Sequence, residues 1–200
     1  MGTRDTILDA AANIMRTRGM ANATTKQIAK AAGFSEATLY KHFRDKEEIF
    51  IDVLRERLPT FTPMVSALQG SAGRDGLRDA LAEVGRRAIA FYYESFPIAA
   101  SVFSEHGLLA HHRSVLASRG AGPHKAGETL AGYLRAEQKH GRIAPSARPD
   151  AVAAMLLGAC LQYAFLGSFA GRPLDSAAAQ SYVDEIVDTL MPALTPRTAR

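Results

Sequence analysis

Residues 24 to 46 of this chain are rich in side chains that carry hydroxyl or ammonium groups and in short side chains. Hydroxyl and ammonium groups can donate hydrogen bonds to phosphate oxygens, and short side chains allow close approach to the edges of bases. The chemistry that these residue types offer is therefore recognition of DNA. The candidate DNA-binding residues are Thr24, Thr25, Lys26, Ser35, Glu36, Ala37, Thr38, Tyr40, Lys41, His42 and Lys46.

Two short helices joined by a tight turn are expected to position these side chains. Thr24 is a good N-cap, and Gln27 completes a capping box at the start of the first helix. Gly33 stands where that helix must end, because glycine accepts the left-handed conformation that a C-terminal turn needs. Ser35 caps the next helix, which should run through Phe43. Two helices of about two turns each, crossed through such a turn, describe a helix-turn-helix.

The apolar spacing of the second helix decides which of its faces is turned outward. Leu39 and Phe43 are apolar at positions four residues apart and should point inward. The short, polar or donating residues between and before them then face outward, which suits a recognition helix whose N-terminal half enters the major groove. Glu36 is ambiguous, because its carboxylate repels phosphate but can also accept a hydrogen bond from a cytosine amino group.

A third cap introduces the next helix. Asp45 and Glu48 form a cap-and-acid pair in front of an apolar run, and we expect a helix from Asp45 to about Leu58. Its start should lie near the DNA. We therefore interpret this helix as a connecting rod: a tilt of its far end would move the helix-turn-helix.

The stretch from Thr38 to Phe50, Thr-Leu-Tyr-Lys-His-Phe-Arg-Asp-Lys-Glu-Glu-Ile-Phe, resembles the signature of the TetR family of bacterial transcriptional regulators. Thr24-Thr25, Ile28-Ala29 and Ala32-Gly33 resemble the same signature. The similarity covers about the first fifty residues. It implies a dimeric repressor that a small ligand releases from its operator.

Composition is that of an ordinary globular protein. Of 200 residues, 47% are hydrophobic and 22% are charged, with a net charge of +4 and a pI of about 9.4. This balance permits a nucleic-acid partner without requiring one. A single cysteine, Cys160, excludes an internal disulfide framework and suits the reducing cytoplasm. The N-terminus lacks an apolar signal core, so we expect a cytoplasmic protein with no membrane partner.

Hydrophobic periodicity predicts an all-α fold with two parts. Residues 1–46 would form a three-helix DNA-binding domain with a helix-turn-helix, and residues 47–200 a helical effector-binding and dimerisation domain. We expect loops at Gln69–Asp75 and His111–Gly122. Besides the helices above, those expected are Thr6–Arg18, Gly76–Ser95, Ile98–Leu109 (after an interruption at Pro97), Pro123–His140, Asp150–Phe169 and Ser176–Leu194.

The helix expected at Asp150–Phe169 is apolar nearly all round, so it should be buried on most sides. Its small residues would let two backbones approach closely. We predict a homodimer in which the last two helices of each subunit form a four-helix bundle, because two helix-turn-helices related by a two-fold axis read both halves of a palindrome. The alternative is that residues 156–169 are simply the core of a monomer.

An effector pocket is expected among the helices between Gly76 and Phe169. The aromatic cluster from Phe91 to Phe103 suggests a mainly apolar or aromatic effector, oriented by a few polar groups. The candidate wall residues are Phe61, Met64, Phe91, Tyr92, Phe96, Phe103, Tyr133, Met155, Gln162, Tyr163 and Phe165.

Other classes of function find less support in the sequence. The histidines lack the spacing that places two imidazoles and an acid on one helix face, and Cys160 has no nearby base, so an enzyme is not expected. No phosphate-cradling glycine-rich loop is present, and no cofactor or metal site is predicted. The alternatives left open are a metal sensor built on residues 106–112 and a helical interaction module that no longer binds DNA.

Overall fold

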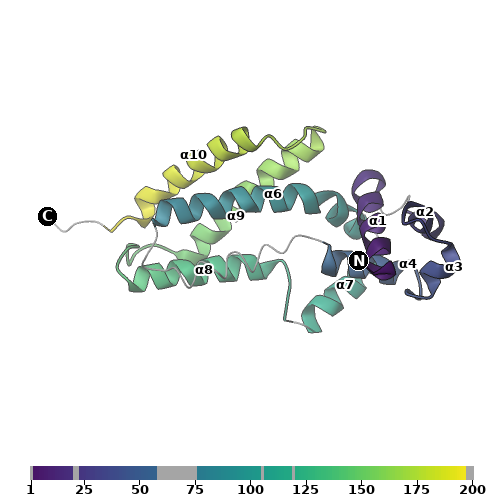
Figure 1. Cartoon of the computed structure of the whole chain (residues 1–200). Helices are drawn as coiled ribbons and strands as arrows, with labels where there is room; N and C mark the ends of the chain where they lie inside the picture. Colours follow the sequence, from purple (N-terminus) through teal and green to yellow (C-terminus); the bar gives the residue numbers. More distant parts are fainter. Residues whose placement is uncertain (1, 20–22, 58–75, 105, 119, 197–200) are drawn as a thin grey trace. The chain divides into compact units, whose positions relative to one another are not determined.

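The computed structural model describes residues 2–19, 23–57, 76–104, 106–118 and 120–196. All regular elements within these residues are helices, as the sequence predicts (Figure 1). The predicted loop at residues 69–75 and the candidates Phe61 and Met64 lie outside the described residues. The helices are α1 (Thr3–Arg18), α2 (Thr25–Ala31), α3 (Glu36–Tyr40), α4 (Lys46–Glu56), α6 (Leu77–Ser104), α7 (His106–Ser118), α8 (His124–Lys139), α9 (Pro149–Phe169) and α10 (Ser176–Leu194).

The chain divides into two compact units, each with its own hydrophobic core. The first unit contains α1 to α4, the end of α6 from Glu94, and α7. The second contains α6 through Tyr93, followed by α8, α9 and α10. The two units are defined by the contacts within each of them and not by function. The predicted functional boundary between residues 46 and 47 therefore stays a prediction.

The first unit is built around apolar residues of α1 and α4. Ile7, Leu8 and Met15 of α1 are fully buried, and α1 contacts both α2 and α4. Phe43 is 2% exposed, which confirms its predicted inward position, and Phe34 packs partly buried against the same core.

Four ion pairs join α1 to α4 in a reciprocal pattern. Arg4 of α1 donates to Asp52 and Glu56 of α4 at 2.5 and 2.9 Å. Arg57, directly after α4, donates back to Asp5 and Asp9 of α1 at 2.9 and 2.6 Å. These pairs reinforce the apolar contact between α1 and α4.

Two predictions of where helices end are wrong. Regular α3 ends at Tyr40 rather than at Phe43, and only single turn hydrogen bonds continue to Phe43, whose amide donates to the Leu39 carbonyl at 3.1 Å. Helix α6 continues through Pro97, although proline removes one helical hydrogen bond. Burial of Ile98 and Val102 after the proline explains why the helix goes on.

The predicted loop at residues 111–122 is also wrong over most of its length. Helix α7 runs to Ser118. Its more buried positions are Leu108, Leu109, His112, Val115 and Leu116, at the i, i+1, i+4, i+7 and i+8 spacing of one helix face. In the sequence, the histidines and serines between these positions hide the periodicity of this helix face.

In the second unit, α9 contacts both α8 and α10 (Figure 1). Leu156, Leu157 and Cys160 face its core, together with Tyr133 of α8 and Val183 of α10. By length and composition, α9 is also the one described helix that could cross a membrane, with 39% of its apolar window buried. Core helices of folded proteins pass the same test, but the prediction that α9 is buried on most sides is wrong for the single chain, in which one side of α9 packs against α8 and α10 and the other is exposed.

Gly85 and Gly167 allow close contacts within this unit. A Cβ atom at Gly85 of α6 would lie 2.6 Å from Val183 Cγ1. A Cβ atom at Gly167 of α9 would lie 1.6 Å from the Tyr93 hydroxyl. Any larger residue at either position would displace its neighbour.

Candidate DNA-binding surface and ligand pockets

Two side-chain caps position the helix-turn-helix. The Thr24 hydroxyl accepts a hydrogen bond from the Gln27 amide at 3.2 Å, and the Gln27 side chain accepts one from the Thr24 amide at 3.2 Å. Ser35 caps α3 by accepting from the Thr38 amide at 3.1 Å. Gly33 lies between the helices with a φ of 77°, in the left-handed region. The predicted capping box and turn glycine are thus confirmed.

A hydrogen-bonded trio links the starts of α2 and α3. The Thr25 hydroxyl donates to the Glu36 carboxylate at 2.5 Å, and the Tyr40 hydroxyl donates to Thr25 at 3.4 Å. Glu36 therefore orients α3 against α2. Any readout of a cytosine amino group by this carboxylate would compete with the bond from Thr25.

The outward face of this motif is polar and accessible. Lys41 and His42 directly follow α3 and are exposed, as are Thr24, Lys26, Ser35 and Ala37. Tyr40 is 50% exposed although it is aromatic. Thr25, Glu36 and Thr38 are half-buried because they take part in the caps and the trio. The structure therefore gathers the predicted DNA-binding residues on one contiguous motif.

Lys46 lies in the first turn of α4, next to this motif in the sequence. Asp45 caps the helix by accepting from the Glu48 amide at 2.8 Å, as predicted. The Lys46 ammonium lies 5.1 Å from the centre of the Phe50 ring, a cation–π distance. This contact holds the charge of Lys46 at the N-terminal end of α4.

The predicted effector residues do not converge on one cavity. Phe96 and Phe103 belong to the first unit, and Phe103 is 67% exposed. Within the second unit, Phe91 and Tyr92 pack partly buried against the core, whereas Tyr133 is fully buried. Met155 and Phe165 lie on the exposed side of α9, 60% and 43% exposed. The predicted residues that share a pocket are Gln162 and Tyr163.

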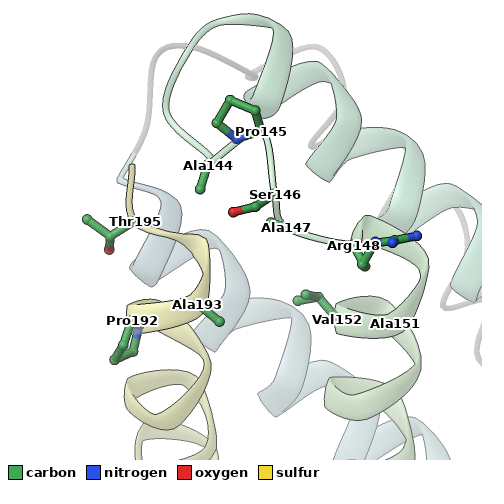
Figure 2. A pocket seen from close by; sticks show the side chains of 10 residues that line it. All are labelled: Ala144, Pro145, Ser146, Ala147, Arg148, Ala151, Val152, Pro192, Ala193 and Thr195. Atoms are coloured by element: carbon green, nitrogen blue, oxygen red, sulfur yellow. The ribbon is translucent and has the colours of Figure 1, made fainter. Parts of the chain in front are cut away.

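A groove of about 710 Å³ lies between the start of α9, the loop before it and the end of α10 (Figure 2). Its walls are mostly small side chains, such as Ala144, Ala147 and Ala193, together with Pro145 and Pro192. In Figure 2 the Arg148 side chain extends away from α10. Such walls offer few groups that could fix the orientation of a ligand.

A second pocket, of about 400 Å³, lies where α9 turns into α10. Sequence reasoning found Gln162 and Tyr163 but missed the other residues here. Tyr93 directly follows two predicted pocket residues, Phe91 and Tyr92, and this position in the aromatic cluster could have indicated it. The lining residues are Tyr93, Gln162, Tyr163, Leu166, Arg172, Pro173, Asp175, Ala178 and Tyr182.

Burial keeps several titratable groups of the second unit uncharged. Desolvation raises the pKa of the Cys160 thiol to about 12 and that of Tyr92 to about 12. Cys160 is thus a protonated core thiol whose sulfur lies 3.5 Å from the Gly85 carbonyl oxygen. Across the described residues, no three His, Cys, Asp or Glu side chains are grouped so that they could hold a metal ion.

Comparison with known proteins identifies the N-terminal motif. The family model described as bacterial regulatory proteins, tetR family, matches residues 7–53. The repressor KstR2 of Mycolicibacterium smegmatis is 40% identical over 55 residues, 28% of this chain and 27% of KstR2. The fatty acid metabolism regulator protein of Bacillus subtilis is 34% identical over 55 residues, 28% of each chain. The matched segment thus spans little more than a quarter of these curated relatives.

Solved structures extend the likeness in fold to the whole chain. A TetR-family regulator from Mesorhizobium loti has a TM-score of 0.78 at 20% identity, covering 96% of both chains. FadR from Bacillus subtilis, solved with stearoyl-CoA, has a TM-score of 0.65 at 19% identity, covering 92% of this chain and 96% of FadR. Residues 7–53 thus carry the DNA-binding motif of the tetR family, and the whole chain shares its fold with these solved structures.

Proposed function

We propose that this protein is a transcriptional repressor that binds a palindromic operator as a homodimer and is released by a small, mainly apolar effector. The observation that carries the proposal is the capped helix-turn-helix, whose outward residues are accessible and polar while Leu39 and Phe43 are buried. TetR-family relatives that match this segment are named as transcriptional repressors and regulators, which supports the same role.

Each side chain has a role in this proposal. Residues at the start of α3, with Lys41 and His42, would meet base edges in the major groove. Thr25, Lys26, Tyr40 and Lys46 would bind phosphates. Ser35 and Glu36 would chiefly hold α3 in place.

The dimer would form through α9 and α10. Large apolar side chains project from the accessible side of α9, a costly arrangement for a surface that stays in water. They are Met155, Leu161, Phe165, Leu166 and Phe169, with the rings of Phe165 and Phe169 stacked at 6.0 Å. A second copy of the same helix pair would cover this face in a four-helix bundle.

Release from the operator would be a shift between two states. The effector would favour a state in which α4 is tilted, and the ion pairs to Arg4 and Arg57 would make α1 follow α4. A coupling of about 1–3 kcal/mol would weaken operator binding roughly 5- to 150-fold. The stearoyl-CoA complex of FadR supports an apolar effector as a class, since it is an acyl ligand on the same fold.

The test is titration of the purified protein, at low salt and without effector, with labelled DNA from upstream of its own gene. Saturable binding that exceeds binding to random DNA is expected. Lys41→Ala should alter the preference among operator variants, whereas Lys139→Ala, at an exposed site at the end of α8, should not. Equal affinity for upstream and random DNA would contradict the proposal. Added zinc that changed operator affinity would favour the metal-sensing alternative.

A further inference from the structure

The pocket at the turn between α9 and α10 has aromatic walls drawn from three helices. The Tyr163 ring lies between two others, with ring centroids 6.4 Å from Tyr93 and 4.8 Å from Tyr182. The Tyr182 hydroxyl donates to the Ala159 carbonyl at 3.3 Å, which fixes that ring against α9. Gly167 makes room for the Tyr93 hydroxyl. The walls are thus held by contacts outside the pocket, and the rings present a preformed apolar surface.

The pocket is lined by one cationic and one acidic side chain. Asp175 is the N-cap of α10, and its carboxylate accepts hydrogen bonds from the Ala177 and Ala178 amides at 2.9 and 3.1 Å. Arg172 is exposed, and none of the ion pairs found in the described part of the chain involves its guanidinium. A guanidinium of this kind suits a carboxylate, which it can bind with two parallel hydrogen bonds.

The Tyr163 hydroxyl adds a neutral donor, whereas the Tyr182 hydroxyl already donates to the Ala159 carbonyl. Desolvation, with the neighbouring Tyr93 and Asp175, raises the pKa of Tyr163 against a smaller lowering by Arg172, and desolvation raises the pKa of Tyr182. Both phenols therefore stay protonated near neutral pH. Gln162, on the rim, offers a further amide donor and acceptor.

We propose that this pocket binds a small aromatic carboxylate, with its ring against Tyr163 and its carboxylate on Arg172. The volume of about 400 Å³ lies within the range of small-molecule sites. The larger groove near Arg148 lacks such walls and is not expected to bind this class. If this pocket is the effector site, that role rests on the proposed function. Binding of the carboxylate itself does not depend on the proposed function.

The probes are β-naphthoate and its uncharged analogue β-naphthamide, titrated calorimetrically into the full chain without DNA. The chain contains no tryptophan, so quenching of tyrosine emission gives a second readout. One naphthoate should bind per chain, and Arg172→Gln should weaken it about tenfold or more, the effect expected for loss of a charged hydrogen-bonding pair. Naphthamide should bind wild type and R172Q with similar, weaker affinity. The control Arg148→Gln changes an exposed arginine at the other groove and should leave naphthoate binding unchanged.

A second pair of variants tests the aromatic wall. Gly167→Ala would drive the Tyr93 hydroxyl away from α9 and should weaken binding of both probes. Gly127→Ala on α8 meets no neighbouring atom within 4 Å and should change neither. Lack of saturable naphthoate binding, or equal affinity in wild type and R172Q, would overturn the assignment. Because DNA is absent, a protein that ignores its operator but binds naphthoate through Arg172 would contradict the proposed function and still support this site.

Discussion

Lys46 is placed to act as a phosphate-binding cation. It lies in the first turn of α4, where the helix N-terminus adds positive potential, and the Phe50 ring restrains its ammonium. An ordered charge loses little conformational entropy when it meets a phosphate. Its contribution to DNA binding should therefore be independent of sequence.

We expect Lys46→Ala to weaken binding to specific and random DNA alike and to lower the slope of log affinity against log salt by about 0.9, the value for one released counterion. Lys46→Arg should restore most of the affinity, since it keeps the charge and the contact with Phe50. Titrations at several salt concentrations measure both quantities. An unchanged slope in the alanine variant would show that α4 does not begin at the DNA backbone.

Glu36 has a hydrogen bond within the motif that a role in DNA recognition would have to compete with. Its carboxylate is already bound by Thr25, whose hydroxyl also accepts from Tyr40. The trio holds three side chains at the base of α3 in one arrangement. From the sequence alone, Glu36 is equally compatible with base recognition, because the contact with Thr25 joins two helices.

At the scale of elements, reciprocal ion pairs join α1 to α4 and to the residue that follows it. The Arg57 guanidinium, followed by the Gly2 amide, lowers the pKa of Asp5 below its ordinary value of 3.8. An aspartate with a lowered pKa stabilises the folded state fully above its unfolded pKa, and the contribution is lost as the pH falls through the folded value. The pair should therefore stabilise the first unit at neutral pH and lose its effect below about pH 4.

Arg57→Gln should lower the free energy of unfolding at neutral pH, and the difference from wild type should shrink in acid, near pH 3. Denaturant-induced unfolding at both pH values measures this difference in the free energy of unfolding. Arg44→Gln is the control, because the Arg44–Glu48 pair lies on the surface with the arginine 83% exposed, and such pairs contribute little. A difference for R57Q that stays constant with pH would argue against a role for the aspartate pairs.

Packing of α6 on α10 depends on one glycine. Gly85→Ala places a methyl group 2.6 Å from Val183 Cγ1, and overpacking of this kind costs about 1–3 kcal/mol. Gly127→Ala, in open space on α8, should be neutral or stabilising, since alanine favours helix. Thermal and denaturant melts of both variants compare the two sites. Adding Val183→Ala to G85A should recover part of the loss, and a fully stable G85A protein would contradict the packing described here.

For the molecule as a whole, local signals in the sequence predicted what local physics determines. The caps at Thr24, Ser35 and Asp45, and both ends of α10, were correctly predicted because each depends on residues a few positions apart. Pro97 and α7 were wrongly predicted because tertiary burial overrides local propensity there. The tyrosine pocket was missed because it unites Tyr93 with Tyr182, and no pattern along the chain links these residues.

The exposed side of α9 should be the dimer surface. We expect wild-type protein to sediment as a dimer at micromolar concentration, and Met155→Glu with Phe165→Glu to sediment as a monomer, because two buried like charges per subunit oppose association. Ala117→Glu, at an exposed position of α7, should remain dimeric. Sedimentation velocity distinguishes these species. A monomeric wild type would remove the dimer from the proposal.

The central claim is that two copies of the motif at residues 24–46 read one face of an operator. A hydroxyl-radical footprint on DNA upstream of the gene, at low salt and without effector, tests this claim directly. Two symmetric protected segments on one face of the duplex, centred one or more helical turns apart, are the expected result. Uniform cleavage at protein concentrations that saturate the titration, or a single unpaired segment, would contradict it.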